Sequence, residues 1–549
     1  MPEPAAAPGA GAPGAGAPGA GAPGAGAPGA GAPGAGAPGA GAPGAGAPGA
    51  GAPGAGTEAG APSSVAATTR YLERITELNP ALGAVITVSP DALDQAAARD
   101  EHQQGPGPLH GVPVLIKDNI DVRGLPATAG SPALSDTGDR GDAFLVTRLR
   151  EAGAVILGKA NLSEWANFRS YRSTSGWSTL GGQAANPHAL DRNPSGSSSG
   201  SGVAVAAGLA PLAVGTETDG SIVCPASACG VVGIKPTLGL VSRRGIVPVS
   251  AAQDTAGPMA RTVAEAAALL GVLAGPDPED PVTAAAEGRP ADYTAFLDPG
   301  ALAGARLGVW RDGCHEAGDT IMAVLDQALD VLRDLGATVL DPVELPGAAG
   351  IGAPEWSSLL HEFKRDINAY LRALPGHAPR SLAGLIEFNL RNGPAVLPHF
   401  GQEIFLRAEA TSGDPADPAA QATRAEVTGR AREALDGPLA GRRLDAIVTL
   451  TANPAGLTDY VLGDNGVFHT SGPSAVAGYP AISVPAGQVR GLPVGLSFLG
   501  PAWSEPALIG LAYAFEQASQ ALSWPSLQGT LPAAAGRSDS LRSWTPGVA

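Results

Sequence analysis

Apolar residues follow two different periodicities along the chain after about residue 57, and their alternation predicts an α/β fold. Val65, Leu72, Ile75 and Leu78 have helical spacing, and Asn79-Pro80 is expected to end that helix. Short apolar runs rich in β-branched residues predict buried strands at 83–88, 111–120 and 154–158. Helices are predicted over 91–101 and 143–152.

The same alternation continues to about residue 522. Further strands are predicted at 306–312, 337–340, 445–450, 481–486 and 494–499, and further helices at 324–335, 359–374, 381–389 and 503–522. Strand–helix–strand alternation indicates a single large domain with a mixed, largely parallel central sheet covered by helices on both faces. Ligands of such sheets bind at the carboxyl ends of strands, and Lys117 lies at one of these ends. The stretch 359–405 is expected to lie beside this site and to shape the substrate pocket.

The first 56 residues have a different character. Proline recurs every five residues from Pro8 to Pro53 in the unit Ala-Pro-Gly-Ala-Gly, which has no side chains that could form a core. We therefore predict a disordered tail over 1–56, a folded domain over 57–525 and a flexible C-terminal tail over 526–549. A translation start placed too far upstream is the alternative explanation of the repeat.

Composition excludes several classes of function. The chain has 34 basic and 51 acidic residues and a net charge of −17, which disfavours binding to nucleic acid. No apolar run is long enough to span a bilayer, and the first residues lack a signal peptide's basic and apolar regions, so a cytoplasmic location is expected. The three cysteines, Cys224, Cys229 and Cys314, provide neither a disulfide framework nor a paired metal site, and are expected to be small buried residues.

Lys117 is a candidate general base. It is one of only four lysines, and it follows the apolar run Val112 to Ile116. Burial disfavours a charged amine, so a lysine at this position is expected to have a lowered pKa and to be able to accept a proton. The alternative is a solvated turn in which Lys117 pairs with Asp118.

Two Gly/Ser-rich segments, 196–202 and 215–221, bracket an apolar run of small residues, 203–214. They contain Ser197 and Ser221, and a serine hydroxyl becomes a nucleophile when a nearby base takes its proton. No histidine lies in either segment. The backbone N–H groups of the second segment could form a nest for an oxyanion. A flexible linker would lack the apolar run between the segments.

A second assignment of the nucleophile is possible. Residues 196–200 match the pattern Gly-x-Ser-x-Gly, which would make Ser198 the nucleophile of an α/β-hydrolase. That pattern requires a strand directly before it. The preceding residues, 190–194, are typical of a loop, which disfavours this assignment.

These features together resemble the amidase signature family of serine hydrolases. The resemblance covers about residues 68–522 and is carried by the run before Lys117, by 158–165, by 194–237 and by 472–480. It implies that Ser221 is the nucleophile that forms an acyl-enzyme, that Ser197 relays its proton after a cis Gly196–Ser197 bond, and that neutral Lys117 accepts it. The implied oxyanion hole consists of the backbone N–H groups of Thr218, Asp219, Gly220 and Ser221. No metal or cofactor is implied.

Within this family the chain is most similar to bacterial peptide amidases, which release ammonia from C-terminal peptide amides. The similarity lies in 193–202, in 219–225 and in Glu362-Phe363-Lys364 with Ala369-Tyr370-Leu371. The expected partner is a peptide or small-molecule amide, not a nucleic acid or a membrane. Aryl, fatty or other small amides are alternative substrates, and a non-catalytic binding protein on the same scaffold is an alternative function. Val223, where many members have arginine, disfavours a tRNA-dependent amidotransferase subunit.

Overall fold

The computed structural model describes residues 62–101 and 107–531. The chain divides into two units, Met1–Gly49 and Ala50–Ala549, and every described helix and strand belongs to the second. The predicted tail over 1–56, and the predicted C-terminal tail beyond Leu531, lie outside the described residues. No described helix combines the length and the apolar character that crossing a membrane requires.

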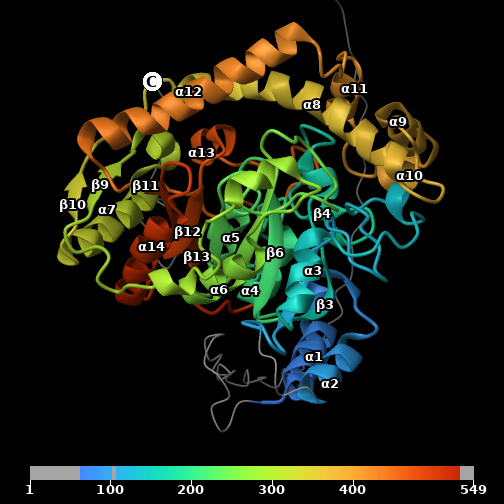
Figure 1. The fold of residues 1–549 in the computed structure, drawn as a ribbon, viewed down its shortest axis with the longest axis horizontal. Helices are drawn as coiled ribbons and strands as arrows, with labels where there is room; N and C mark the ends of the chain where they lie inside the picture. The colour runs from blue at the N-terminus through green and yellow to red at the C-terminus, as the bar shows by residue number, and fades with distance from the viewer. Residues whose placement is uncertain (1–61, 102–106, 532–549) are drawn as a thin grey trace, which may run out of the picture. The chain divides into compact units, whose positions relative to one another are not determined.

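An 11-stranded mixed sheet forms the centre of the fold (Figure 1). The strand order is β1-β3-β2-β6-β8-β7-β12-β13-β11-β9-β10. Parallel pairs join β3, β2 and β6 near one edge and β11, β9 and β10 at the other, and antiparallel pairs join the strands between these groups. The strands are β1 (Val85–Val88), β2 (Pro113–Lys117), β3 (Val155–Ala160), β6 (Leu212–Glu217), β7 (Val232–Lys235), β8 (Thr255–Ala260), β9 (Arg306–Val309), β10 (Thr338–Leu340), β11 (Ala446–Leu450), β12 (Ala481–Val489) and β13 (Leu492–Leu499). A separate small hairpin consists of β4 (Trp177–Ser178) and β5 (Gly182–Gln183).

Helices cover both faces of this sheet, as predicted. The α-helices of the described residues are α1 (Ser64–Leu82), α2 (Ala92–Glu101), α3 (Phe144–Glu151), α4 (Ser199–Ala206), α5 (Val223–Cys229), α6 (Val263–Leu273), α7 (Asp319–Asp334), α8 (Gly352–Ala373), α9 (Leu382–Arg391), α10 (Gly393–Val396), α11 (Glu403–Glu409), α12 (Pro418–Arg442), α13 (Gly472–Ala477) and α14 (Glu505–Ser519). Alternate residues of β2 enter different cores, since Val114 and Ile116 pack with α3 and α6, whereas Leu115 packs with α1 and α4. The sheet is therefore buried on both sides.

The first helix differs from its predicted length. Asn79-Pro80 does not end α1, which continues to Leu82 and is capped by Gly83 in a left-handed conformation. A proline in the last turn is tolerated here because only one backbone hydrogen bond of the helix is lost. The helix ends where Gly83 can adopt a positive φ, and the N–H of Gly83 donates to the carbonyl of Asn79.

Two long helices, α8 and α12, lie against each other across one end of the sheet, and α12 also contacts α13 (Figure 1). The predicted helices at 359–374 and 381–389 correspond to α8 and α9, and α8 begins seven residues earlier than predicted. Helix α12 was not predicted. Its buried positions include Val427, Ala431 and Ala434, which have helical spacing but are mostly small.

Residues 526–531 belong to the predicted C-terminal tail but are described, and they hydrogen-bond to an earlier loop. Leu190 N–H donates to the carbonyl of Gln528, and Leu527 N–H donates to that of Pro187. The Thr530 hydroxyl donates to Asp191. These contacts place the end of the described chain beside the loop that leads to the first Gly/Ser segment.

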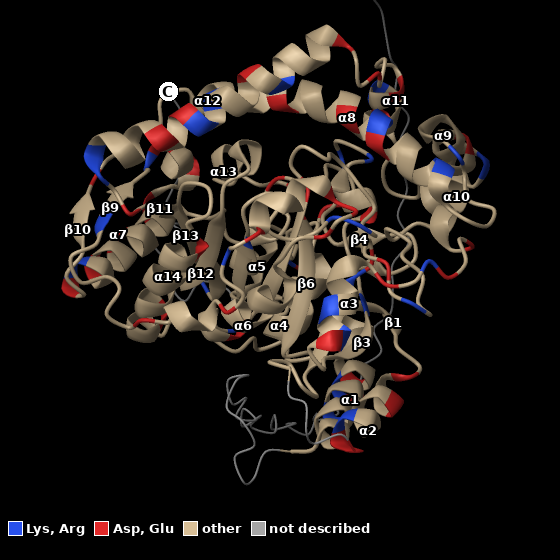
Figure 2. Cartoon of the chain, viewed as in Figure 1, with Lys and Arg blue, Asp and Glu red and all other residues tan. Residues whose placement is uncertain are grey.

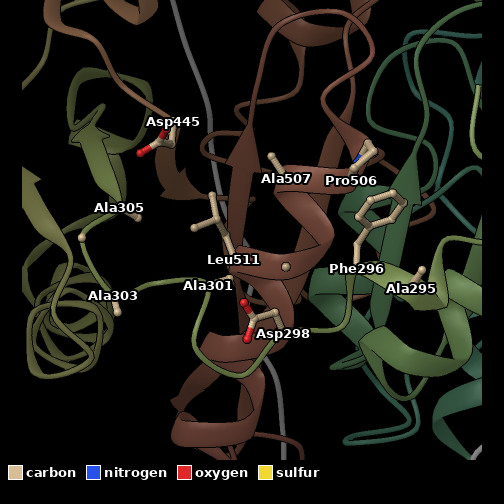
Figure 3. Close-up of a pocket in the computed structure, with 12 residues that line it drawn as sticks. Ala295, Phe296, Asp298, Ala301, Ala303, Ala305, Asp445, Pro506, Ala507 and Leu511 are labelled. Carbon is tan, nitrogen blue, oxygen red and sulfur yellow. The ribbon is translucent and has the colours of Figure 1, made fainter.

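A surface pocket of about 560 Å³ lies beside the N-terminal half of α14 (Figure 3). Its lining combines small apolar residues of 295–305 with Phe296, Leu511 and the carboxylates of Asp298 and Asp445. None of the candidate catalytic residues lines it. The candidate catalytic residues therefore lie outside this pocket.

Candidate active site

Lys117 is the last residue of β2, a strand buried along its whole length between β3 and β6. Its side chain is fully buried. The Nζ atom lies 2.8 Å from Ser197 Oγ, 3.0 Å from Ser198 Oγ and 2.8 Å from Thr216 Oγ1. It also lies 3.1 Å from the Thr216 carbonyl oxygen. The structure thus brings the predicted base and one predicted serine into hydrogen-bonding contact.

The electrostatic surroundings of Lys117 make it a weak base by lysine standards. Burial lowers the pKa of Lys117 from 10.5 to about 7, although the negative charges of Glu217 and Asp254 oppose this shift. The alternative pairing with Asp118 does not occur. Asp118 instead forms an ion pair with Lys159 at 3.3 Å. Lys117 is therefore poised to gain or lose a proton near neutral pH.

Ser197 lies in a turn that enters α4 and is fully buried. The peptide bond between Gly196 and Ser197 is cis, as the family resemblance implies. The Ser197 carbonyl accepts a hydrogen bond from Ser163 N–H at 3.1 Å. The next residue ties the two Gly/Ser segments together, because Ser198 N–H donates to the Ser221 carbonyl at 3.1 Å.

Every hydrogen-bonding position of the Ser198 hydroxyl is occupied. It donates to the Thr216 carbonyl oxygen at 3.0 Å and accepts from Thr216 N–H at 3.2 Å and from Lys117 Nζ. Ser198 is fully buried, and no strand precedes its segment, whose helix α4 begins at Ser199. A hydroxyl with one proton and two acceptor lone pairs has no capacity left for a substrate. Ser198 is thus poorly suited to be a nucleophile.

Residues Thr218 to Ser221 form a bend between β6 and α5. Within the described part of the chain, their four backbone N–H groups donate no hydrogen bond. Ser221 is 9% exposed, whereas Lys117 and Ser197 are completely buried. The described residues include no hydrogen-bond partner of the Ser221 hydroxyl. The candidate site thus combines the buried amine of Lys117 with Ser221, which is partly accessible to solvent, and with the unused N–H donors of the bend.

Two buried carboxylates support this bend. Glu217 Oε2 accepts from the N–H groups of Ile222 and Val223, at 2.7 and 3.1 Å. Asp254 accepts from the Thr218 hydroxyl at 2.6 Å, and burial raises its pKa to about 7. Burial also raises the pKa of Glu217, against the attraction of Lys235. Glu217 and Asp254 therefore hold the bend through hydrogen bonds to the Thr218 hydroxyl and to the N–H groups that follow the bend, so the N–H groups of Thr218 to Ser221 remain unused.

Sequence reasoning missed Thr216, Glu217 and Asp254. Thr216 lies on β6, the strand beside β2, and its hydroxyl contacts both Lys117 Nζ and Asn119 Nδ2. The register of these two parallel strands, in which Ile116 is paired with Val214, brings Thr216 close to Lys117 and could have identified it. That register could not be read from the sequence without first recognising β6 as a strand.

All three cysteines are buried and free, as predicted. Within residues 62–101 and 107–531, no group of three or more His, Cys, Asp or Glu side chains could hold a metal ion.

Gly220 is required by the geometry of the bend. Its φ is +77°, and a Cβ atom there would lie 2.8 Å from Cys224 Sγ and 2.9 Å from Ser471 Oγ. We expect Gly220→Ala to displace the neighbouring N–H groups and to lower kcat by about a hundredfold, the scale of a displacement of about 1 Å. Steady-state kinetics would measure this loss. Gly429→Ala, on an open part of α12, is the matched control and should leave kcat unchanged. Equal kcat for the two variants would contradict the expectation.

The chain is similar to known proteins over most of its length. The family model for amidases matches residues 66–509. A probable amidase of Arabidopsis thaliana is 44% identical over 464 residues, which cover 82% of this chain and 85% of the relative. The native peptide amidase from Stenotrophomonas maltophilia superimposes with a TM-score of 0.80 at 49% identity, and the match covers 85% of this chain and 96% of that structure. The A-type subunit of a glutamyl-tRNA(Gln) amidotransferase from Symbiobacterium thermophilum is 36% identical over 477 residues, 84% of this chain and 95% of the relative. The chain therefore belongs to the amidase signature family of amide-hydrolysing enzymes.

Proposed function

We propose that this enzyme hydrolyses the C-terminal carboxamide of peptides to a carboxylate and ammonia, through an acyl-enzyme on Ser221. Ser197 relays the proton of Ser221, and Lys117 is the base that receives it. The oxyanion is held by backbone N–H groups of Thr218 to Ser221. The observation that carries the proposal is the contact of 2.8 Å between Lys117 Nζ and Ser197 Oγ, in a fully buried setting beside free N–H donors.

The first half of the reaction forms the acyl-enzyme. Ser221 Oγ adds to the carbonyl carbon while its proton passes to Ser197 Oγ and the Ser197 proton passes to neutral Lys117. The C=O electron pair moves onto oxygen, and N–H groups of the bend stabilise this charge. The tetrahedral intermediate then collapses, its C–N bond breaks, and the nitrogen takes the proton back along the same path and leaves as ammonia.

The second half repeats these steps with water. Water adds to the ester carbonyl and delivers a proton to Lys117 through Ser197, because Ser221 Oγ is now the ester oxygen and has no proton to relay. The proton then returns along the same path to Ser221 Oγ as the C–O bond of the ester breaks, which restores the Ser221 hydroxyl and releases the carboxylic acid. The relay begins with a proton transfer from Ser221 to Ser197, and the hydrogen bond between these two hydroxyls is expected to form when substrate fills the site. Catalytic hydrogen bonds often tighten only in that complex.

Peptide amides are the proposed substrates because of two similarities. The first is the overall match to the peptide amidase from Stenotrophomonas maltophilia. The second is the pair of motifs at 193–202 and 219–225. Val223 also supports a hydrolase over an amidotransferase subunit, since its side chain is buried in an apolar cluster with Trp310 and Val476 rather than being an arginine.

The proposal predicts a substrate preference that can be measured directly. Ammonia release should be followed for a peptide amide, an aryl acetamide and a long-chain acyl amide, each with the full chain alone. We expect the kcat/KM of the peptide amide to exceed that of the other two amides by about tenfold or more. The ratio of kcat/KM values for two substrates measures how much more tightly the enzyme binds the transition state of one than of the other. A higher kcat/KM for either of the other amides would refute peptide amides as the preferred class. Turnover that requires tRNA and a second protein chain would instead support the amidotransferase function.

A further inference from the structure

Gln253 connects the candidate oxyanion bend to the two long helices. It lies just before β8 and is almost completely buried. Its Nε2 atom donates to the Thr218 carbonyl oxygen at 3.2 Å and to Glu355 Oε1, on α8, at 2.8 Å. Its Oε1 atom accepts from the guanidinium of Arg424, on α12, at 2.6 Å. One amide group thus joins three parts of the chain.

The orientation of this amide is determined by its partners. An amide nitrogen carries two protons, and here both face oxygen acceptors. The amide oxygen faces a guanidinium, which can only donate. A flipped amide would place its oxygen against the Thr218 carbonyl oxygen and its NH₂ group against the Arg424 guanidinium. Gln253 is therefore held in one orientation, with an N–H directed at Thr218.

The Arg424 guanidinium, which binds the Gln253 oxygen, is itself held in place. Arg424 makes two hydrogen bonds to Glu362 of α8, at 2.7 and 2.6 Å, and Glu362 also accepts from the Ser250 hydroxyl at 2.6 Å. Figure 2 shows residues of both charges along α8 and α12. Parallel hydrogen bonds between guanidinium and carboxylate restrict both groups strongly. Side chains of both α8 and α12 therefore hold Gln253 in place.

The contact with Thr218 has a geometric consequence. The peptide bond between Thr218 and Asp219 is trans, so its C=O and N–H point in opposite directions. A hydrogen bond that fixes the Thr218 carbonyl therefore also fixes the direction of the Asp219 N–H. That N–H is one of the four unused donors of the bend. The Thr218 hydroxyl, bound to Asp254, anchors the same residue a second time.

We propose that Gln253 is a positioning residue that aims the Asp219 N–H at the transition-state oxyanion, supported by Glu355 and Arg424. The proposal rests on the proposed function, since it presupposes that this bend stabilises an oxyanion. Gln253 does not touch the reacting atoms. It acts through the peptide plane that it holds, and through it α8 and α12 contribute to the rate of the chemical step.

The test compares Gln253→Met with wild type and with Gln517→Met, the same change at an exposed position of α14. We expect Gln253→Met to lower kcat about tenfold to a hundredfold while KM changes by less than about threefold, since an oxyanion contact forms only in the transition state. Glu355→Gln keeps an oxygen acceptor for Gln253 and should retain more of kcat than Glu355→Ala. Kinetics would use whichever amide the wild type hydrolyses, so the result does not depend on peptide amides being the substrate.

An aldehyde with the acyl group of whichever amide the wild type hydrolyses provides a readout that a purely structural role would not change. Addition of the serine hydroxyl to the aldehyde carbonyl forms a tetrahedral adduct, which resembles the transition state, whereas the product acid with the same acyl group does not. Gln253→Met should weaken the aldehyde's inhibition by the same factor as kcat and leave inhibition by the acid unchanged. An unchanged kcat would overturn the proposal, and so would equal losses for aldehyde and acid. If Gln253→Met does not fold, Arg424→Met must show the same selective loss, and the proposal fails without it.

Discussion

Ser221→Ala is expected to reduce amide hydrolysis by about 10⁶-fold, to the rate that oxyanion stabilisation and binding alone can support. The proposed acyl-enzyme needs an oxygen nucleophile, and the residue at this position is the part of the proposed triad that solvent can reach. A hydrogen atom replaces the hydroxyl and adds no volume, so the fold should be unaffected. Ammonia release under saturating substrate would measure the loss.

Two further observations would separate this assignment from its rivals. Wild type quenched during turnover of an ester analogue should carry an acyl group on Ser221, detectable by mass spectrometry, and Ser221→Ala should not. Ser201→Ala is the matched control, because it removes a buried hydroxyl of α4 whose one hydrogen bond to the described residues is to the Val214 carbonyl, away from Lys117 and Ser197. If Ser221→Ala kept full activity and Ser198→Ala lost it, the nucleophile would be Ser198 and the proposed mechanism would be wrong.

The sequence predicted the fold well where secondary structure follows a simple apolar period. Strands β2 and β3 are short and uninterrupted, and they lie where the β-branched runs indicated. Strands β6, β7 and β8, at the centre of the sheet, were not predicted. They are buried on both faces, so they show no polar–apolar alternation, and small residues dilute their apolar character.

Helix α4 illustrates a second limit. Its first residues, Ser199 to Gly202, have poor intrinsic helix propensity. The reason for glycine is tertiary, since a Cβ at Gly200 would lie 2.3 Å from the Ala84 carbonyl oxygen and 2.5 Å from that of Asn161. Packing at this distance determines the sequence, and no local pattern reveals it. The Gly/Ser segment was recognised through its motif rather than through any helical signal.

In the candidate site too, the residues marked by a local sequence pattern were predicted, and those brought in from distant segments were not. Lys117 was identified because lysine is rare in this chain and stands here after an apolar run, and the two serine segments were identified through their motif. The structure brings Lys117 and Ser197 into contact. Gln253 and Glu355 carry no such signal. They are separated by 102 residues and meet only because α8 returns to the end of the sheet. Residues that position a site from distant segments need the folded chain to be found.

The buried position of Lys117 has opposite consequences for stability and for catalysis. Its folded-state pKa, about 7, lies below the ordinary 10.5, so protonation at neutral pH favours the unfolded chain. The resulting loss of stability is present below pH 7 and disappears as the pH rises towards 10.5. An apolar replacement removes this cost. A variant such as Lys117→Met should therefore unfold at a temperature no lower than wild type at pH 7.

Activity should respond in the opposite way, because the proposed mechanism starts from neutral Lys117. We expect Lys117→Met to lower kcat about 10⁴-fold, in the range for loss of a triad member. For wild type, kcat/KM should rise with pH around an apparent pKa of about 7 and fall roughly tenfold per pH unit below it. Rate–pH profiles between pH 5 and 9 would measure this. Lys364→Met, on a lysine that contacts the Glu409 and Thr411 carbonyls, is the control and should keep the wild-type profile. A wild-type profile that is flat through pH 7, or activity retained in Lys117→Met, would show that another group takes the proton.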